Sequence, residues 1–394
     1  MHNSPESHFK KPRMEHTEIK HYLFSEIFKA SLFIANNMVR NNKYTNSNSY
    51  TYIDLFAGSG KFEDDSKGSP LIAIDIAANH LKYKGNAFNE IDLIFIEKDK
   101  QNADELKKNV ELELEKHNLE NLRVKIGDGS WEEYDIEKIL RDSTWGFVFA
   151  DPFSTELKLE DLKNELENYS KYKDILIFAN FITLARQYAR SHDNDIKRVC
   201  EFFGISENEL QGDIDFSEKF IELLKNKLRK IKDFSIGVAI PIAVKKELRT
   251  MNYFYLVLFT SSVMVGNAFL KSYADIIEKY RNKESNLPFD NYNEEPLYNL
   301  LKKVKKLSLY EIWEYYQQNF LSWKKLITDS NLKVPTLKNI TGIINNFKNN
   351  CLLEIAADGK YLYKKPKIRN GYINYNNLKN IHDLKEIKIN STSL

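Results

Sequence analysis

Short apolar runs alternate with longer amphipathic stretches along the first two thirds of the chain. Five of these runs have the length and the β-branched or aromatic content of buried strands, at 52–54, 91–97, 122–126, 147–150 and 174–180. The stretches 17–41, 70–83 and 100–117 have helical length, with apolar residues roughly at helical spacing in the first of them. Strands that alternate with helices predict an α/β fold with a mostly parallel, doubly wound sheet.

Two further apolar runs, 234–244 and 253–260, lie close together in the sequence. Only eight residues separate them, which is too short for a crossover helix. We therefore expect an antiparallel hairpin that completes the sheet. The predicted divisions are an N-terminal helical segment at 1–50 and an α/β domain at 51–281, with a helical insertion near 182–232.

The last quarter of the chain has a different pattern. Residues 282–299 are rich in asparagine, proline and charged side chains, which predicts a linker. Three amphipathic stretches then precede two short apolar runs on either side of Asp358-Gly359, a pair typical of tight hairpin turns. Three helices followed by a hairpin predict a winged helix-turn-helix domain over 300–370, with 371–394 as a tail.

The net charge is only +2, but it is distributed unevenly. Residues 296–394 contain 17 Lys/Arg and 7 Asp/Glu, a balance of +10, which leaves −8 for residues 1–295. A basic segment favours a polyanion as partner, and a solvated lysine-rich face is the alternative. Two cysteines make no disulfide framework, and no apolar run reaches the ~20 residues of a membrane helix. Without an apolar export signal, we expect a cytoplasmic location.

Asp54 ends the first strand and precedes a turn that contains Gly58 and Gly60. Small turn residues let the backbone come close to a ligand. A P-loop is disfavoured because Phe62 stands where a hydroxyl residue is needed, and a dinucleotide fingerprint because Glu63 replaces the third glycine. An acid before the turn suits the cationic amino acid part of S-adenosylmethionine. An ordinary strand–loop connection is the alternative.

Two more acids follow the next two strands, and ligands of open α/β sheets bind outside the carboxyl ends of the strands. Glu97 ends the second strand, where a carboxylate can accept hydrogen bonds from both ribose hydroxyls. Asp128 follows the third strand, where it can accept from the adenine amino group. Many strands end in an acidic residue, so one such residue is weak evidence. The prediction of a cofactor site depends on three of them following three successive strands. The predicted S-adenosylmethionine-binding residues are Asp54, Phe56, Gly58, Gly60, Glu97 and Asp128.

Asp151-Pro152-Phe153 follows the fourth strand, where the substrate meets the cofactor in this architecture. Amino methyltransferases use Asp/Asn-Pro-Pro-aromatic there to aim the lone pair of the target amine at the methyl group. We predict all three residues as catalytic, with the second proline missing and the aromatic ring one place early. No cysteine lies near this loop as a nucleophile. The histidines show no ligand spacing, so no metal is predicted. Lys20-His21 on the first helix is expected at the surface, and a place near the cofactor cleft is the alternative.

These motifs together resemble the three-Cys-motif partner protein family over about residues 15–275. The segments that carry the resemblance are Lys20-His21, Tyr52–Gly60, Gly68-Ser69-Pro70-Leu71, Phe95–Asp99 and Asp151–Phe153. The resemblance implies a class I S-adenosylmethionine-dependent methyltransferase-like fold, often followed by a winged helix, and a protein partner with a cysteine motif. The family's cofactor loop falls on Asp54, Gly58 and Gly60. Ser59 stands where that family commonly has a proline, and Ser154 where it commonly has a glycine.

The sequence therefore predicts an S-adenosylmethionine-dependent methyltransferase that acts on an amino group of DNA or RNA. The alternative is a catalytically inactive protein of the same fold that regulates by binding nucleic acid or a protein partner. Basic and amide side chains of the third winged-helix helix and of its wing are expected to contact the nucleic acid. These residues are Lys338, Asn339, Asn345, Lys348, Lys360, Lys364 and Lys365.

Overall fold

A computed structural model describes most of the first 280 residues and four short strands beyond them. The described ranges are 15–41, 48–152, 157–167, 172–179, 193–210, 223–224, 236–243, 253–280, 306–307, 353–355, 360–363 and 386–389. The chain divides into two compact units, Met1–Phe269 and Leu270–Leu394, and each is described by itself.

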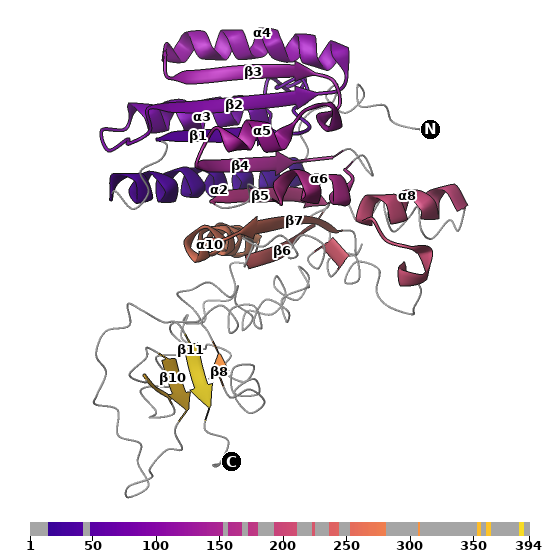
Figure 1. Cartoon of the computed structure of the whole chain (residues 1–394). Coiled ribbons are helices and arrows are strands. Elements are labelled where there is room, and N and C mark those ends of the chain that lie inside the picture. Colours follow the sequence, from indigo (N-terminus) through magenta and orange to yellow (C-terminus); the bar gives the residue numbers. More distant parts are fainter. Residues whose placement is uncertain are drawn as a thin grey trace, which may run out of the picture. The chain divides into compact units, whose positions relative to one another are not determined.

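The first unit contains a seven-stranded sheet in the order β3-β2-β1-β4-β5-β7-β6 (Figure 1). Its strands are β1 (Ser49–Asp54), β2 (Glu90–Glu97), β3 (Leu122–Asp128), β4 (Trp145–Ala150), β5 (Lys173–Ala179), β6 (Ile236–Ala243) and β7 (Tyr253–Thr260). The first five strands pair in parallel, and β7 runs antiparallel to both of its neighbours. The predicted parallel sheet and its antiparallel hairpin are both confirmed.

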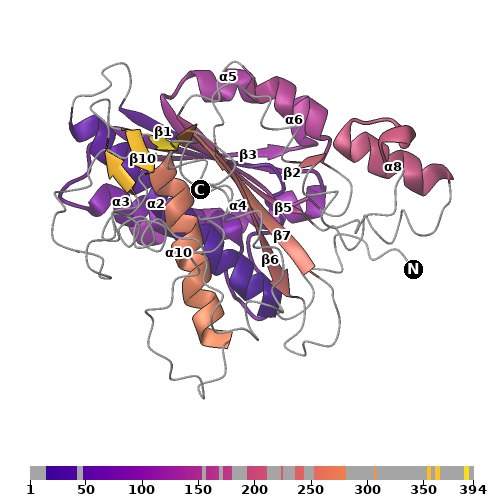
Figure 2. The ribbon, with the colours of Figure 1, turned by 90° about the horizontal axis from the view of Figure 1, so that it is seen from below.

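Helices cover both faces of this sheet. On one face lie α2 (Glu15–Arg40), α3 (Ser69–Lys82) and α4 (Lys100–His117), and on the other lie α5 (Ile136–Arg141) and α6 (Leu159–Leu166) (Figure 2). The remaining described helices are α8 (Asp193–Phe203), α10 (Val263–Tyr280) and the short 3-10 turns Trp131–Glu133 and Glu207–Leu210. No helix in the described ranges is long and apolar enough to cross a membrane.

Local sequence explains where two of these helices begin. Asp99 caps α4, since its side chain accepts a hydrogen bond from the Asn102 backbone N–H at 2.8 Å. Helix α3 begins after Gly68, which takes the cap position, and Ser69 lies in the first turn just before Pro70. Gly68 takes this position because its N–H donates to the Gly60 carbonyl at 2.8 Å, and an added Cβ would crowd that backbone.

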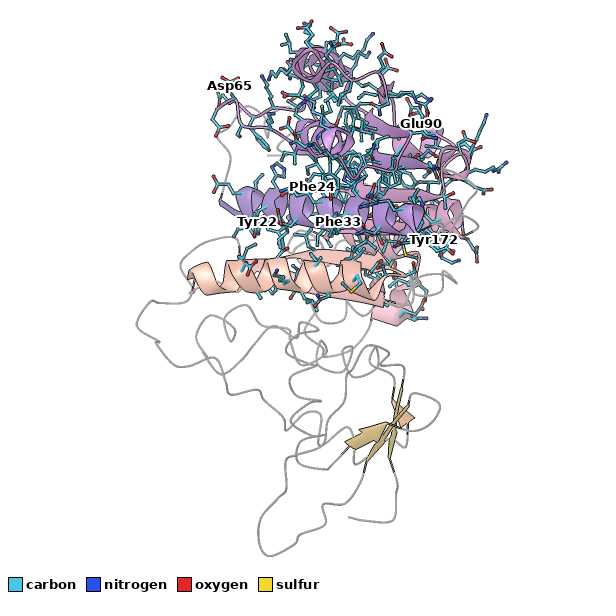
Figure 3. The ribbon with its side chains drawn as sticks, turned by 90° about the vertical axis from the view of Figure 1, so that its left-hand side faces the viewer. Tyr22, Phe24, Phe33, Asp65, Glu90 and Tyr172 are labelled. Atoms are coloured by element: carbon cyan, nitrogen blue, oxygen red, sulfur yellow. The ribbon has the colours of Figure 1, made fainter. Side chains whose placement is uncertain are left out.

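Aromatic side chains form the core between α2 and the centre of the sheet. Phe24 lies 4.7 Å from Phe149 and Phe28 lies 4.8 Å from Tyr52, measured between ring centroids, and all four residues are buried. Phe33 points away from this face and is 51% exposed (Figure 3). Helix α2 therefore packs one apolar stripe on β1 and β4 and belongs to the α/β unit.

The second unit contains a small sheet in the order β8-β11-β10-β9. Its strands are β8 (Lys306–Leu307), β9 (Leu353–Ile355), β10 (Lys360–Tyr363) and β11 (Glu386–Ile389). Strands β9 and β10 pair antiparallel, as predicted for the two apolar runs on either side of Asp358-Gly359. Strand β11 comes from the stretch predicted as a tail and pairs parallel to β10. The three helices predicted for the winged helix-turn-helix lie outside the described residues.

A candidate ligand site at the carboxyl edge of the sheet

The predicted acidic residues meet at one edge of the central sheet. In the strand register, Asp54 pairs with Phe95 of β2 and with Phe149 of β4, and Glu97 pairs with Asp128 of β3. Asp151 follows the end of β4 directly. All four acids therefore lie at the carboxyl ends of neighbouring parallel strands, where ligands of such sheets bind.

The glycine turn after β1 has a backbone that few other residues could adopt. Gly58 and Gly60 have φ angles of 64° and 82°, and a Cβ on Gly60 would lie 2.9 Å from the Leu106 side chain. Backbone hydrogen bonds hold the turn to both neighbouring strands, from Leu55 N–H to the Phe149 carbonyl at 3.0 Å and from Ala57 N–H to the Ile96 carbonyl at 2.9 Å. The turn is thus fixed by β2 and β4 together.

Asp54 is fully buried at the start of this turn. Its carboxylate accepts the Phe56 backbone N–H and the Tyr52 hydroxyl, both at 3.2 Å. Burial raises the pKa of Asp54 to about 7; hydrogen bonds from Ser69 and Phe56 oppose this shift, and the nearby negative charge of Asp151 adds to it. Asp54 therefore stabilises the turn through its hydrogen bond to the Phe56 backbone N–H.

Lys20 of α2 forms an ion pair with Asp151, through the carboxylate oxygen Oδ2. The Lys20 side chain is 7% exposed and that of Asp151 is 23% exposed, and the ammonium lies 4.7 Å from the centre of the Phe178 ring. The expectation that Lys20 lies at the surface was wrong. The alternative place near the cleft is the one that the structure shows, because α2 runs across the sheet and places this residue over the edge. Pro152 is buried, and Phe153 lies outside the described residues.

Glu97 links the end of β2 to the glycine turn. Its oxygens accept the backbone N–H of Gly58 at 2.7 Å and that of Asp99 at 2.8 Å. Burial raises the pKa of Glu97, and these two hydrogen bonds oppose the shift. Each carboxylate oxygen can accept a second hydrogen bond, so the contacts leave capacity for ligand hydroxyls.

Asp128 lies at the same edge but faces solvent. Its side chain is 60% exposed, and the nearest cation is the Lys107 ammonium at 3.6 Å. Gly129 follows with a φ of 152°, and an added Cβ would meet the Glu133 carboxylate at 2.8 Å. The Asp128 carboxylate is thus open to an incoming donor.

Two contributors to this edge, Tyr52 and Ser69, were missed by the sequence reading, and a third, Lys20, was placed near the cleft only as the alternative. Lys20 occupies the same stripe of α2 as Phe24 and Phe28, one turn apart each. A lysine on an apolar face was a detectable signal, because it must find a buried partner. Tyr52 and Ser69 gave no such signal, since their contacts with Asp54 depend on the fold of the turn.

Comparison with known proteins gives likeness in structure at low sequence identity. No family model and no curated protein matches the chain. A Legionella pneumophila protein of the DUF519 family has 11% identity over 65% of this chain and 92% of its own, with a TM-score of 0.37. Spermidine synthase from Thermotoga maritima has 10% identity over 72% of this chain and 69% of its own, with a TM-score of 0.31. The O-methyltransferase TomG from Streptomyces achromogenes, in complex with SAM, has 11% identity over 60% of this chain and 79% of its own, with a TM-score of 0.30.

Proposed function

We propose that the protein is an S-adenosylmethionine-dependent methyltransferase whose acceptor is an amino group of nucleic acid. The observation that carries the proposal is the placement of Asp151, held by Lys20, beside Asp54 and the glycine turn. A parallel sheet completed by an antiparallel hairpin supports the same class, because class I methyltransferases have this plan.

The carboxyl edge suits the cofactor in the following way. The glycine turn receives the methionine part, while Asp54 below it keeps the turn in shape without touching the ligand. The Glu97 oxygens accept the ribose hydroxyls through their remaining lone pairs, and the exposed Asp128 accepts from the adenine amino group. When bound, the cofactor supplies an electrophilic methyl group.

The acceptor amine is oriented by Asp151. Lys20 binds Oδ2, which leaves Oδ1 free to accept an N–H of the incoming amine. This hydrogen bond fixes the direction of the amine lone pair, and the adjacent carboxylate charge stabilises the positive charge that develops on nitrogen. Lys20 acts through Asp151 as a positioning residue.

The basic C-terminal part supports a polyanionic substrate. Its charge balance is +10 over residues 296–394, and Lys360 is the first residue of strand β10. The other proposed nucleic-acid-binding residues, Lys338, Asn339, Asn345, Lys348, Lys364 and Lys365, lie outside the described residues. Membership of the three-Cys-motif partner protein family, with a partner that carries a cysteine motif, is part of the same proposal.

Two measurements test this function. Calorimetry with S-adenosylmethionine should give one binding site, and labelled methyl groups should pass from the cofactor into DNA or RNA rather than protein. Asp151→Asn should keep cofactor binding and lower transfer about a hundredfold or more. Asp161→Asn, an exposed acid on α6, is the matched control and should change neither. No binding at millimolar cofactor overturns the proposal.

One observation favours the non-catalytic alternative, a regulator that binds nucleic acid. The Lys20 ammonium already occupies Asp151, the residue proposed to receive the amine. In that case Asp151→Asn leaves the cellular function intact, whereas changing Lys364 and Lys365 to alanine abolishes it. The reverse pattern favours the enzyme.

A further inference from the structure

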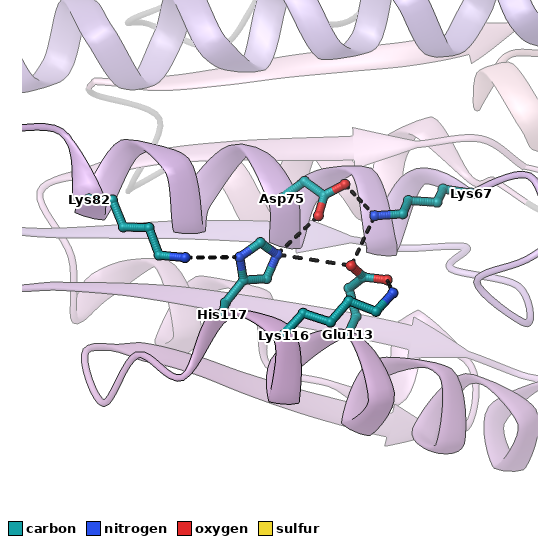
Figure 4. Close-up of polar contacts among 6 residues, drawn as sticks. All are labelled: Lys67, Asp75, Lys82, Glu113, Lys116 and His117. Carbon is teal, nitrogen blue, oxygen red and sulfur yellow. Dashed lines mark hydrogen bonds and ion pairs between the residues drawn. The ribbon is translucent and has the colours of Figure 1, made fainter.

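A second cluster of charged side chains lies between helices α3 and α4, away from the acids of the carboxyl edge. Asp75 comes from α3, and Glu113 and His117 lie one turn apart on α4 (Figure 4). Lys67, which precedes α3, reaches both carboxylates, with its ammonium 2.5 Å from Asp75 Oδ2 and 2.9 Å from Glu113 Oε1. Neither the cofactor edge nor the acceptor residue uses these four side chains.

We propose that Asp75, Glu113 and His117 form a site for a divalent transition-metal ion of the Zn²⁺ type, which takes the place of the Lys67 ammonium. One ligand atom from each residue lies within 4.8 Å of the other two. One imidazole nitrogen and two carboxylate oxygens are ligands that Zn²⁺ accepts, with water in the fourth position. Ligand atoms around Zn²⁺ lie about 3.4 Å apart, so the ligand atoms must close by up to about 1.4 Å.

The three donors already face one point. His117 Nε2 lies 3.0 Å from Asp75 Oδ1 and 4.0 Å from Glu113 Oε1. The Glu113 side chain is only 2% exposed, so its charge requires a cation close by. Lys67 supplies that cation in the metal-free form, with its ammonium 2.9 Å from Glu113 Oε1. A divalent ion at this point offers two charges where Lys67 offers one.

Two other lysines, Lys116 and Lys82, also contact the proposed ligands, but they compete with a metal ion less than Lys67 does. Lys116 binds the second oxygen of Glu113 at 2.9 Å and can stay there, because a metal needs only one carboxylate oxygen. The Lys82 ammonium lies 3.4 Å from His117 Nδ1, so metal binding at Nε2 moves the ring proton to Nδ1 and turns Lys82 away into water. Lys67 must also leave, and it is therefore the main competitor.

Replacement of the Lys67 ammonium by a metal ion affects a segment that is bonded to the glycine turn through the next residue, Gly68. Gly68, its neighbour, donates its N–H to the Gly60 carbonyl at 2.8 Å, and Lys61 and Lys67 form a β-bridge. The segment 61–67 therefore has its two ends tied together at the turn. Releasing the Lys67 side chain removes its link from this segment to α3 and α4.

The test is calorimetric titration of the full chain with Zn²⁺ at pH 7.5, with Mg²⁺ as the comparison ion. We expect one equivalent of Zn²⁺, and a loss of affinity of about tenfold or more for both His117→Ala and Glu113→Gln. Glu105→Gln, an exposed acid on the same helix, is the matched control and should bind as the wild type does. Lys67→Met should bind Zn²⁺ more tightly than the wild type, because the competing ammonium is gone.

The outcomes separate a metal site from a cluster of ion pairs. Thermal unfolding without metal shows first that each variant is folded, and His117→Gln replaces His117→Ala if that variant is not. Equal Zn²⁺ affinity in the wild type and the His117 variant overturns the proposal. So does a Lys67→Met variant that binds no better than the wild type, since Lys67 then holds a purely structural ion pair. Bound Co²⁺ should also lose its visible absorption band when His117 is replaced.

Discussion

Two buried aspartates lie at opposite edges of the same sheet, and the comparison shows what makes one of them a candidate for function. Asp54 ends β1 at the carboxyl edge, and Asp174 lies near the start of β5 at the amino edge. Both are fully enclosed, and burial raises the pKa of Asp54 to about 7 and that of Asp174 to about 6. A buried carboxylate with a raised pKa therefore does not by itself identify a site.

The surroundings of the two carboxylates differ. Asp174 accepts hydrogen bonds from Ser31 at 2.5 Å and from Thr260, and Ser31 in turn accepts from the Tyr50 hydroxyl at 2.6 Å. These donors come from α2, β1 and β7, so the network ties a helix to the sheet. Asp54 instead lies under a glycine turn and close to the partly exposed Asp151. The two edges therefore differ in whether a ligand can approach a carboxylate from solvent, and they do not differ in whether their aspartate is buried.

The largest effect should come from Lys20→Met, which leaves Asp151 partly buried without its counter-ion. Removing one member of a buried ion pair costs about 3–5 kcal/mol, and the partial exposure of Asp151 places this case near the lower end. Urea unfolding at pH 7 measures the loss. Lys20→Arg keeps the charge and should recover most of the stability, and equal losses in both variants would show that packing, not charge, is lost.

Gly60→Ala should cause the second-largest loss of stability, because it strains the turn itself. A positive φ and a contact of 2.9 Å with the Leu106 side chain both oppose a methyl group there, at a cost of about 1–3 kcal/mol. Cofactor affinity should fall as well, since the turn moves. The matched change, Gly204→Ala, also falls at a positive φ but lies after α8, so it should cost stability without altering cofactor binding.

Asp54→Asn and Asp174→Asn compare the two edges directly. Each removes one charged acceptor and should change stability by about 1 kcal/mol, because the neighbouring hydroxyls can rotate to donate or accept. Only Asp54→Asn should weaken binding of S-adenosylmethionine, by about tenfold. Calorimetry on both variants gives the answer, and equal affinity in the two contradicts the role given to Asp54.

Within a single pH unit near neutrality, the smallest effect is the pH dependence of stability. A carboxyl group with a raised pKa in the folded state binds its proton more tightly there, so stability falls as pH rises from about 4 to the folded pKa. The decline contributed by Asp174 should end near pH 6, and that of Asp54 near pH 7. Between pH 6 and 7 the Asp54 share is about 1 kcal/mol or less.

Unfolding of the wild type and both asparagine variants from pH 4 to 7 separates the two contributions. The difference between wild type and Asp174→Asn should stop changing near pH 6, and that for Asp54→Asn near pH 7. Burial lowers the pKa of Lys173 to about 7, so this lysine adds stability as pH rises from about 6, to the same extent in the wild type and in Asp54→Asn. A pH-independent difference for both variants contradicts the raised pKa values.

Much of the α/β unit could be read from the sequence because its signals are local. Apolar runs of strand length gave the five parallel strands, and the short polar stretch between two late runs gave the β6–β7 hairpin. Gly58 and Gly60 marked the turn, since few other residues take those φ angles without strain. The acids at the strand ends followed, because parallel strands place their carboxyl ends at one edge.

The pairings among these side chains were not readable in the same way. Lys20 and Asp151 are 131 positions apart, and Asp75 and His117 are 42 apart. The histidines showed no ligand spacing along the chain, yet His117 meets Asp75 across two packed helices. Glu97 was expected to face a ligand, and the fold also gives it two backbone N–H groups to bind.

The sequence by itself determined the order of strands and helices, the position of the glycine turn and the acids that follow the strands. These depend on periodicity and backbone sterics, which act over a few residues. Only the tertiary structure decided which carboxylates are enclosed, which are paired with a lysine and which remain open. That choice depends on the packing of α2, α3 and α4 against the sheet, because burial and the nearest opposite charge set the free energy of every ionised group.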